Sequence, residues 1–232
     1  MTNSFKTLGL RAELLETLDS LGYTEMTAIQ QQALPIVLEG KDVIGQGKTG
    51  SGKTAAFSLG LLSNLNVQRF RVQTLVLCPT RELADQVAKE IRTLARGIHN
   101  IKVLTLCGGM PMGPQIGSLE HGAHILVGTP GRILDHMSKG RISLDELNTL
   151  VLDEADRMLD MGFIHDIKKI ISKLPKKRQT LLFSATMPAD IEKLAQNLLN
   201  NPIKVEVTPE SSTVSKIEQS ISFLTKENKL KL

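Results

Sequence analysis

The sequence predicts an α/β fold in which a mostly parallel sheet carries helices on both of its faces. From residue 42 onward, short apolar runs typical of strands alternate with longer runs typical of helices. Several strand-like runs, such as residues 149–152, are apolar without alternation, as expected for strands that are covered on both faces. Repeated alternation of strand and helix favours parallel strands joined by right-handed crossovers. Ligands of such sheets bind beyond the carboxyl ends of the strands.

The elements can be placed along the chain from the same patterns. Residues 1–40 predict two helices, of which the second is capped by Thr27 and has Pro35 either in its last turn or at a kink. The strand-like runs are 42–46, 73–78, 101–106, 124–128, 148–153, 179–183 and 203–207. The helix-like runs are 53–65, 81–97, 113–120, 131–138, 155–172 and 188–199. We expect residues 1–40 to pack on a core domain at 41–208, and residues 209–232 to begin a linker.

The composition limits the classes of function. The 232 residues are 41% hydrophobic and 22% charged, which is enough for one substantial core. A net charge of +4 permits a nucleic-acid partner without requiring one, and 3% aromatic residues without Trp disfavour a stacking platform of many rings. Cys78 and Cys107 each end an apolar run, which indicates buried reduced thiols. Without a membrane-length apolar run or a signal-peptide pattern, we expect a cytoplasmic protein with no membrane partner.

Residues 47–54 fit the pattern G-x-x-x-x-G-K-[ST] of a phosphate-binding loop, between a strand-like and a helix-like run. Glycines let backbone N–H groups crowd around a polyphosphate, and the following helix points its positive end at the same charge. Lys53 supplies a cation for the outer phosphates, and Thr54 offers a hydroxyl to Mg²⁺. A glycine-rich turn before a helix is the plainer interpretation, but the flanking elements favour a nucleotide site. Its predicted residues are Gly47, Lys48, Thr49, Gly50, Ser51, Gly52, Lys53 and Thr54.

Two carboxylates, Asp153 and Glu154, follow the fifth strand-like run. This edge of the sheet, next to the phosphate-binding loop, is where an acidic ligand for Mg²⁺ is needed. We therefore expect Asp153 to hold the ion together with Thr54, and Glu154 to orient and deprotonate an attacking water. Acidic residues are also favoured at any helix N-terminus, which alone would explain them. Their place beside a phosphate loop favours the catalytic interpretation, with Lys53 as the third catalytic residue.

These separated motifs, in this order, resemble the DEAD-box family of ATP-dependent RNA helicases, whose name is spelled by residues 153–156. The resemblance covers residues 5–207, which is the extent of a first RecA-like domain. It implies a RecA-like P-loop fold, ATP and Mg²⁺ as cofactors, RNA as partner, and ATP hydrolysis coupled to local RNA unwinding. It also implies that Gln30 reads the adenine edge and that Phe5 stacks on the base. Residues 26–30 lack both prolines of the family's usual motif, and Gly47 stands where the family usually has Ala.

The resemblance assigns RNA contacts to three further motifs. Hydroxyls, helix N-terminal amides and arginines suit contacts to the phosphate backbone that do not read sequence. Helix capping and a turn would explain the same threonines and glycines, and both interpretations can hold together. The implied RNA-binding residues are Pro79, Thr80, Arg81, Gly108, Gly109, Thr129, Pro130, Gly131 and Arg132. The resemblance also counts Ser184 and Thr186 among the catalytic residues. They match the motif that couples hydrolysis to strand separation, through hydrogen bonds to Asp156.

Residues 75–87 and 104–109 resemble more closely a bacterial subgroup that acts in assembly of the large ribosomal subunit, which implies ribosomal RNA as the partner. The family's second RecA-like domain, with its arginine fingers, does not form part of these residues, so we expect this chain alone to be nearly inactive. A P-loop kinase or GTPase stays possible, although no guanine-recognition motif or acceptor site is evident. A non-catalytic RNA-binding module is the other alternative, and intact Lys53, Asp153 and Glu154 argue against it.

Overall fold

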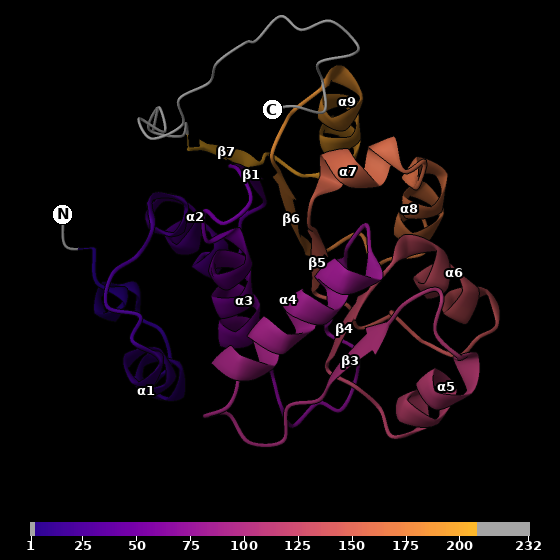
Figure 1. Cartoon of the computed structure of the whole chain (residues 1–232), viewed down its shortest axis with the longest axis horizontal. Helices are drawn as coiled ribbons and strands as arrows, with labels where there is room; N and C mark the ends of the chain where they lie inside the picture. Colours follow the sequence, from indigo (N-terminus) through magenta and orange to yellow (C-terminus); the bar gives the residue numbers. More distant parts are fainter. Residues whose placement is uncertain (1–2, 208–232) are drawn as a thin grey trace, which may run out of the picture.

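A computed structural model describes residues 3–207, so the predicted linker at 209–232 lies outside the described residues. Seven strands form one sheet in the order β3-β4-β2-β5-β6-β1-β7, and every pair of neighbouring strands is parallel (Figure 1). The predicted α/β class is therefore confirmed, and each strand lies within or beside a predicted run. The strands are β1 (Val43–Gln46), β2 (Thr74–Leu77), β3 (Val103–Leu106), β4 (Ile125–Gly128), β5 (Thr149–Leu152), β6 (Gln179–Ser184) and β7 (Ile203–Glu206).

The helices follow the predicted alternation with one correction. The expected helix at 155–172 is two helices, because Gly162 adopts a left-handed φ of 80° and ends the first of them. The Phe163 N–H then donates to the Met158 carbonyl at 3.0 Å, which closes the turn. A short 3-10 helix (Phe5–Leu8) precedes α1 (Ala12–Leu21), α2 (Ala28–Leu38), α3 (Lys53–Asn64), α4 (Arg81–Leu94), α5 (Met112–Glu120), α6 (Pro130–Ser138), α7 (Ala155–Asp160), α8 (Ile164–Ile171) and α9 (Ala189–Leu198).

Alternate side chains of the central strands enter two different cores. Leu75 and Leu77 of β2 pack into one apolar cluster, and Val76 between them packs into the other. Helices α1 to α4 cover the Val76 side, and α6 to α9 cover the opposite side (Figure 1). Because both faces are covered, the central strands are mostly apolar, and polar exceptions such as Thr74, Thr149 and Thr180 are themselves buried. Cys78 and Cys107 are buried free thiols just after β2 and β3, as predicted.

The N-terminal helices pack directly on the sheet domain. Gly22 ends α1 with a left-handed φ of 77°, and Pro35 lies in the last turn of α2. Leu14 and Leu18 of α1 are buried in the same apolar cluster as α3. The Arg11 guanidinium donates to two carbonyls at the end of α3, at 2.9 Å and 3.1 Å. Residues 3–40 are thus fixed against the helix that follows the phosphate loop.

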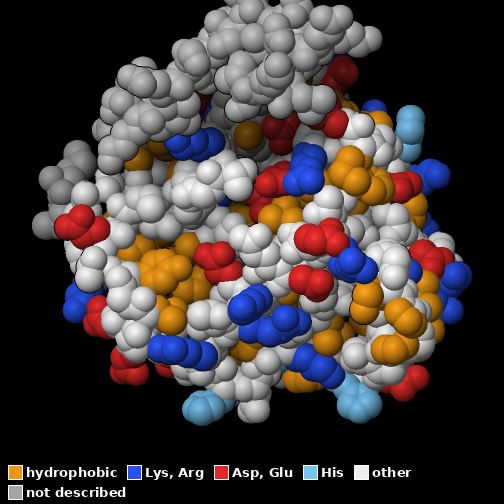
Figure 2. Space-filling model, in the orientation of Figure 1, with side chains coloured by type: hydrophobic (Ala, Val, Ile, Leu, Met, Phe, Trp, Pro, Cys, Tyr) orange, Lys and Arg blue, Asp and Glu red, His pale blue; other side chains and the backbone are white. Residues whose placement is uncertain are grey.

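Parallel topology brings the polar motifs to one edge. The phosphate loop follows β1, Pro79 follows β2, Thr129 follows β4, Asp153 follows β5, and the connection after Ser184 follows β6. Positive and negative side chains are interspersed over the face shown in Figure 2. That mixture fits the small net charge and favours local contacts over one broad basic surface. Within residues 3–207, no helix combines the length and apolarity that crossing a membrane requires.

Candidate active site

The phosphate loop connects β1 to α3 and depends on two left-handed glycines. Gly50 and Gly52 have φ values of 82° and 94°, which L side chains rarely adopt. A Cβ on Gly52 would lie 2.6 Å from Gln30 Nε2 and 2.8 Å from Thr27 Oγ1. The start of α2 therefore presses against the loop backbone, and only glycine fits at Gly52.

Lys53 lies at the first position of α3 and folds back onto the loop. Its ammonium donates to the Gly47 carbonyl and, at 2.8 Å, to the Lys48 carbonyl. Burial lowers the pKa of Lys53, while the nearby carboxylates Asp153 and Glu154 oppose this effect. The cation is thus held by the loop carbonyls, within the electrostatic reach of both predicted catalytic carboxylates.

Asp153 is buried at the end of β5, where it is 3% exposed. Burial raises its pKa to about 7, with Lys53 acting in the opposite direction and Glu154 adding to the rise. Its Oδ1 accepts a hydrogen bond from the Glu154 N–H at 3.1 Å. A buried carboxyl whose charge is incompletely compensated is well suited to a cation, because a cation favours the ionised form.

Glu154 has an uncommon backbone conformation at the start of α7. Its φ of 51° and ψ of 54° are left-handed, which few residues other than glycine adopt. The Glu154 carboxylate pairs with Arg157 at 3.1 Å, and its side chain is 17% exposed. Such outliers persist where surrounding contacts hold them, and they cluster at functional sites.

One cavity of about 500 Å³, which we call the nucleotide cavity, joins the loop to the carboxylates. Five residues of the loop and α3 line it, together with Asp153 and Glu154: Thr49, Gly50, Gly52, Lys53 and Thr54. Gly47, Lys48 and Ser51 do not line it. Gln86, Glu90 and Arg157 do line it and were not predicted. Spacing of four residues puts Gln86 and Glu90 on one face of α4, which is the only sequence signal that could have indicated them.

The cavity offers a partial ligand set for Mg²⁺. Thr54 and Asp153, the two predicted metal ligands, both line it. Within the described residues, no group of three His, Cys, Asp or Glu side chains is close enough to hold a metal. Mg²⁺ commonly binds one or two carboxylates together with phosphate oxygens and water. The donors present therefore fit a Mg²⁺ ion that arrives with a nucleotide.

The two predicted adenine-binding residues occupy different environments. Gln30 Oε1 accepts the Thr27 N–H at 2.9 Å, and Gln30 Nε2 donates to the Gly52 carbonyl at 3.2 Å. Both ends of this amide are thus paired between α2 and the phosphate loop. Phe5 is 3% exposed, packs edge-on against Tyr23 at a centroid distance of 6.4 Å, and does not line the nucleotide cavity. Adenine recognition by either residue stays a prediction.

The predicted RNA-binding motifs meet in a second cavity of about 550 Å³, which we call the RNA groove. Its lining includes Pro79, Thr80, Arg81, Gly108, Thr129, Gly131 and Arg132, but not Gly109 or Pro130. Thr129 Oγ1 accepts the Gly108 N–H at 3.2 Å, and Arg132 donates to the Met110 carbonyl at 3.0 and 3.1 Å. Thr80 also caps α4 by accepting the Leu83 N–H at 3.2 Å. The helix cap and the predicted RNA contact therefore involve the same threonine.

Sequence reasoning missed the apolar wall of the RNA groove. Met161 and Phe163 line it from the turn between α7 and α8, where a single continuous helix was expected. Met161 is 48% exposed, which is unusual for a large apolar side chain. The turn at Gly162 gives Met161 this position, so predicting it required the break in the helix.

The predicted coupling residues are in contact. Asp156 Oδ2 accepts from the Thr186 N–H at 2.9 Å and from the Thr186 hydroxyl at 2.8 Å. The Asp156 N–H donates to Ser184 Oγ at 3.2 Å. These three bonds join the first turn of α7 to the end of β6.

Known proteins resemble the chain along nearly all of its length. A family model described as DEAD/DEAH box helicase matches residues 27–194. The chain is 53% identical to an ATP-dependent RNA helicase DbpA of Escherichia coli (strain K12), over 99% of the chain and 50% of that relative. It is 46% identical to a DEAD-box ATP-dependent RNA helicase CshA of Geobacillus kaustophilus, over 93% of the chain and 46% of that relative.

A solved structure agrees with these sequence matches. The crystal structure of a DEAD box protein from the hyperthermophile Methanococcus jannaschii superposes with a TM-score of 0.85 at 40% identity, covering 88% of this chain and 56% of that one. The chain spans about half the length of the curated relatives it matches. The family model covers more than half of the chain, and the described fold has the same architecture. The chain therefore belongs to the DEAD/DEAH box helicase family.

Proposed function

We propose that this chain binds ATP with Mg²⁺ in the nucleotide cavity and one face of an RNA strand in the RNA groove. Joined to a second RecA-like domain, it would use ATP hydrolysis to drive local separation of RNA strands. The observation that carries this proposal is the single cavity in which Lys53, Thr54, Asp153 and Glu154 all lie. The matches to ATP-dependent RNA helicases support the same activity.

Each side chain in the nucleotide cavity has a separate role in this proposal. The Lys53 ammonium, which donates to the carbonyls of Gly47 and Lys48, would donate to phosphate oxygens of the nucleotide. Thr54 and Asp153 hold Mg²⁺, which neutralises phosphate charge when it is bound. Glu154 accepts the proton of the attacking water, and its left-handed backbone places its carboxylate beside the cavity.

A binding experiment tests the nucleotide assignment. Calorimetric titration of ADP–Mg²⁺ into the 232-residue chain is expected to show saturable binding, and Lys53→Ala is expected to weaken it by at least tenfold. Lys89→Ala, on the exposed side of α4, is a matched control that should leave binding unchanged. Equal affinity for GDP–Mg²⁺ would contradict ATP specificity and would favour a GTPase.

RNA binding is expected to be backbone-directed and independent of sequence. Arg81 and Arg132 border the RNA groove, and arginines there suit phosphate contacts. Arg132→Ala is expected to weaken binding of a fluorescent single-stranded RNA 10-mer in anisotropy titrations, with a smaller salt dependence. Arg69→Ala removes an arginine that is 69% exposed and lies outside the groove, so it controls for lost charge. If both variants bind alike, the groove is not the RNA site.

We also propose ribosomal RNA as the natural partner, cytoplasmic location, and a role in assembly of the large ribosomal subunit. The close resemblance of residues 75–87 and 104–109 to a bacterial subgroup with that role supports this narrower proposal. A protein in which this chain is joined to a second RecA-like domain should then unwind short duplexes flanked by large-subunit ribosomal RNA faster than duplexes flanked by an unrelated RNA of equal length. Equal rates would leave the helicase proposal intact but would contradict the ribosomal one.

A further inference from the structure

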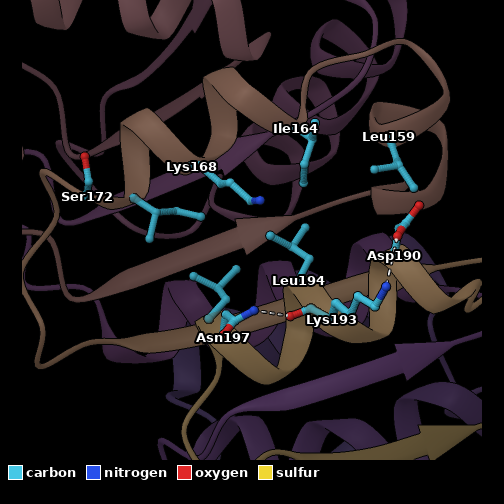
Figure 3. Close-up of a pocket in the computed structure, with 10 residues that line it drawn as sticks. Leu159, Ile164, Lys168, Ser172, Asp190, Lys193, Leu194 and Asn197 are labelled. Atoms are coloured by element: carbon cyan, nitrogen blue, oxygen red, sulfur yellow. Dashed lines mark hydrogen bonds and ion pairs between the residues drawn. The ribbon is translucent and has the colours of Figure 1, made fainter.

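A third cavity lies apart from both predicted binding sites. It has a volume of about 620 Å³ and is formed between α8 and α9 (Figure 3). We call it the α8–α9 groove. It shares no lining residue with the nucleotide cavity or the RNA groove. No role assigned so far uses this surface.

The floor of the α8–α9 groove is aliphatic. Leu159 of α7, Ile164 and Ile171 of α8, and Leu194 and Leu198 of α9 line it. Leu194 is buried, and the other four side chains are half-buried, so part of each faces water. Several half-exposed aliphatic side chains on one concave surface are typical of interaction sites.

The rim of the groove has more positive than negative charge. Figure 3 shows the Lys168 side chain of α8 extending over the groove, while Lys193 of α9 points along the opposite side toward Asp190. Within residues 3–207, Lys168 forms no ion pair. Lys193 meets Asp190 only at 3.8 Å, with side chains 73% and 71% exposed. A pair so exposed contributes little, so both ammonium groups can interact with a partner's carboxylates.

We propose that the α8–α9 groove is a docking surface for an acidic amphipathic helix of another protein. Ile164 and Ile171 are seven residues apart on α8, and Leu194 and Leu198 are four apart on α9, so the apolar floor extends along the helix axes. A helix binds such a groove through apolar residues spaced three, four and seven apart. Asp or Glu residues beside those anchors would face Lys168 and Lys193. Charge complementarity therefore selects an acidic partner over a basic one.

The groove is connected to the candidate active site through its walls. Leu159 belongs to α7, the helix that begins directly after Glu154. The α9 wall begins three residues after Thr186, which is hydrogen-bonded to Asp156 of α7. A docked helix would thus touch α7, which contains Asp156, and α9, which begins shortly after Thr186. The docking proposal itself does not depend on nucleotide or RNA binding.

Two synthetic peptides of 16 residues test the proposal. Both carry Leu at positions 3, 6, 10 and 13, and they differ in having either Glu or Lys at the positions beside each Leu. The ¹⁵N-labelled chain is titrated with each peptide and followed by NMR. We expect the acidic peptide to bind about tenfold more tightly at low salt, with shift changes concentrated in residues 159–198. Equal binding, or shift changes centred elsewhere, would overturn the proposal.

Charge reversal provides the matched control. Lys168→Glu/Lys193→Glu should reverse the preference, so that the basic peptide binds more tightly than the acidic one. Lys89→Glu/Lys6→Glu changes the net charge equally on surfaces outside the groove and should keep the original preference. These lysines are exposed, so both variants are expected to fold. If both double variants behave alike, only net charge matters and the groove is not the docking surface.

The same peptides and variants also test two other possible occupants of the groove. If a single-stranded RNA 10-mer displaces the acidic peptide and Lys168→Glu/Lys193→Glu weakens RNA binding as much as peptide binding, the groove binds RNA instead. If sedimentation shows a dimer that Ile164→Ser dissociates, a second copy of this chain is the occupant. Either result overturns the proposal. A monomer whose peptide affinity falls at least fivefold in Ile164→Ser supports it.

Discussion

Thr186 holds Asp156 through two hydrogen bonds to one carboxylate oxygen, from its backbone N–H at 2.9 Å and from its hydroxyl at 2.8 Å. Burial raises the pKa of Asp156, but its hydrogen bonds with Thr186 and Ser184 outweigh burial and leave the pKa below its ordinary value. The ionised carboxylate therefore fixes the first turn of α7 against the segment that leads into α9.

Removing the Thr186 hydroxyl should weaken that connection without abolishing it. Thr186→Val keeps the N–H bond and is expected to lower the free energy of unfolding by about 1 kcal/mol in urea titrations. Thr186→Ser keeps both donors and should restore stability. In a protein that joins this chain to a second RecA-like domain, we expect Thr186→Val to slow RNA strand separation more than ATP hydrolysis. An equal reduction of both activities would contradict a coupling role.

Replacing the predicted base should separate binding from chemistry. Glu154→Gln keeps the shape of the side chain and removes its basicity. In a protein that joins this chain to a second RecA-like domain, turnover should therefore fall by about 10²–10⁴-fold with ATP and RNA binding retained. Phosphate release and equilibrium binding measure the two effects separately. Near-normal hydrolysis by Glu154→Gln would show that another group accepts the proton.

The isolated chain should bind nucleotide but hardly hydrolyse it. In related P-loop enzymes, arginines supplied from outside the loop contribute roughly 10³–10⁵ in rate. The family's second RecA-like domain supplies such residues, so we expect phosphate release by this chain to stay near background with and without RNA. Robust RNA-stimulated turnover by the 232 residues alone would contradict this expectation.

Gly47→Ala tests how the phosphate loop is ordered before nucleotide binds. Because the family usually has Ala here, the substitution is expected to reduce the number of conformations open to the loop before nucleotide binds. ADP binding should then be about two- to fivefold tighter. The structure adds a constraint, since a Cβ on Gly47 would lie 3.1 Å from Ser51 Oγ. That hydroxyl is buried and has no hydrogen-bond partner within residues 3–207. We therefore expect the full gain only when Gly47→Ala is combined with Ser51→Ala, as measured by calorimetry against Ser51→Ala alone. Identical gains in both backgrounds would show that Ser51 does not restrict the loop.

Acid should destabilise the chain through two buried histidines. Burial lowers the pKa of His124, and burial together with Arg132 and Arg141 lowers the pKa of His136. Below pH about 6.5 the unfolded chain therefore takes up protons that the folded chain excludes, so stability is complete above that pH and falls as pH decreases. The loss is at most about 1.4 kcal/mol per pH unit for each histidine. Urea titrations at pH 7.5, 6.5 and 5.5 should show a smaller fall for His136→Gln than for the exposed control His165→Gln. Equal slopes would assign the acid effect to other groups.

The strands could be predicted from sequence, but their order could not. Runs such as Leu75-Val76-Leu77 are apolar on both faces, and that pattern survives in any order of parallel strands. The observed order depends on which way each crossover turns, which the apolar pattern does not encode. The break between α7 and α8 was missed because the helical pattern continues through Gly162, and an isolated glycine is often tolerated within a helix.

Some residues of the candidate site could likewise be predicted from sequence, and others could not. Lys53, Asp153 and Thr129 could be predicted to share one edge because each follows a parallel strand. Gln86 and Met161 could not, because a helix face and a turn place them at the cavities. The α8–α9 groove depends on the spacing between two helices, which no local pattern determines. Tertiary geometry, rather than residue type, decides these positions.

The left-handed backbone of Glu154 has a consequence for how this protein can be altered by selection. Glycine and asparagine adopt that conformation more readily than glutamate, so either should raise stability by about 1 kcal/mol at this position. A search for heat-tolerant variants that measures only stability would thus favour replacing Glu154, and with it the carboxylate proposed as the base. Only a requirement for turnover would retain it. At residue 154, natural selection for activity would therefore retain glutamate, whereas laboratory selection for stability would replace it.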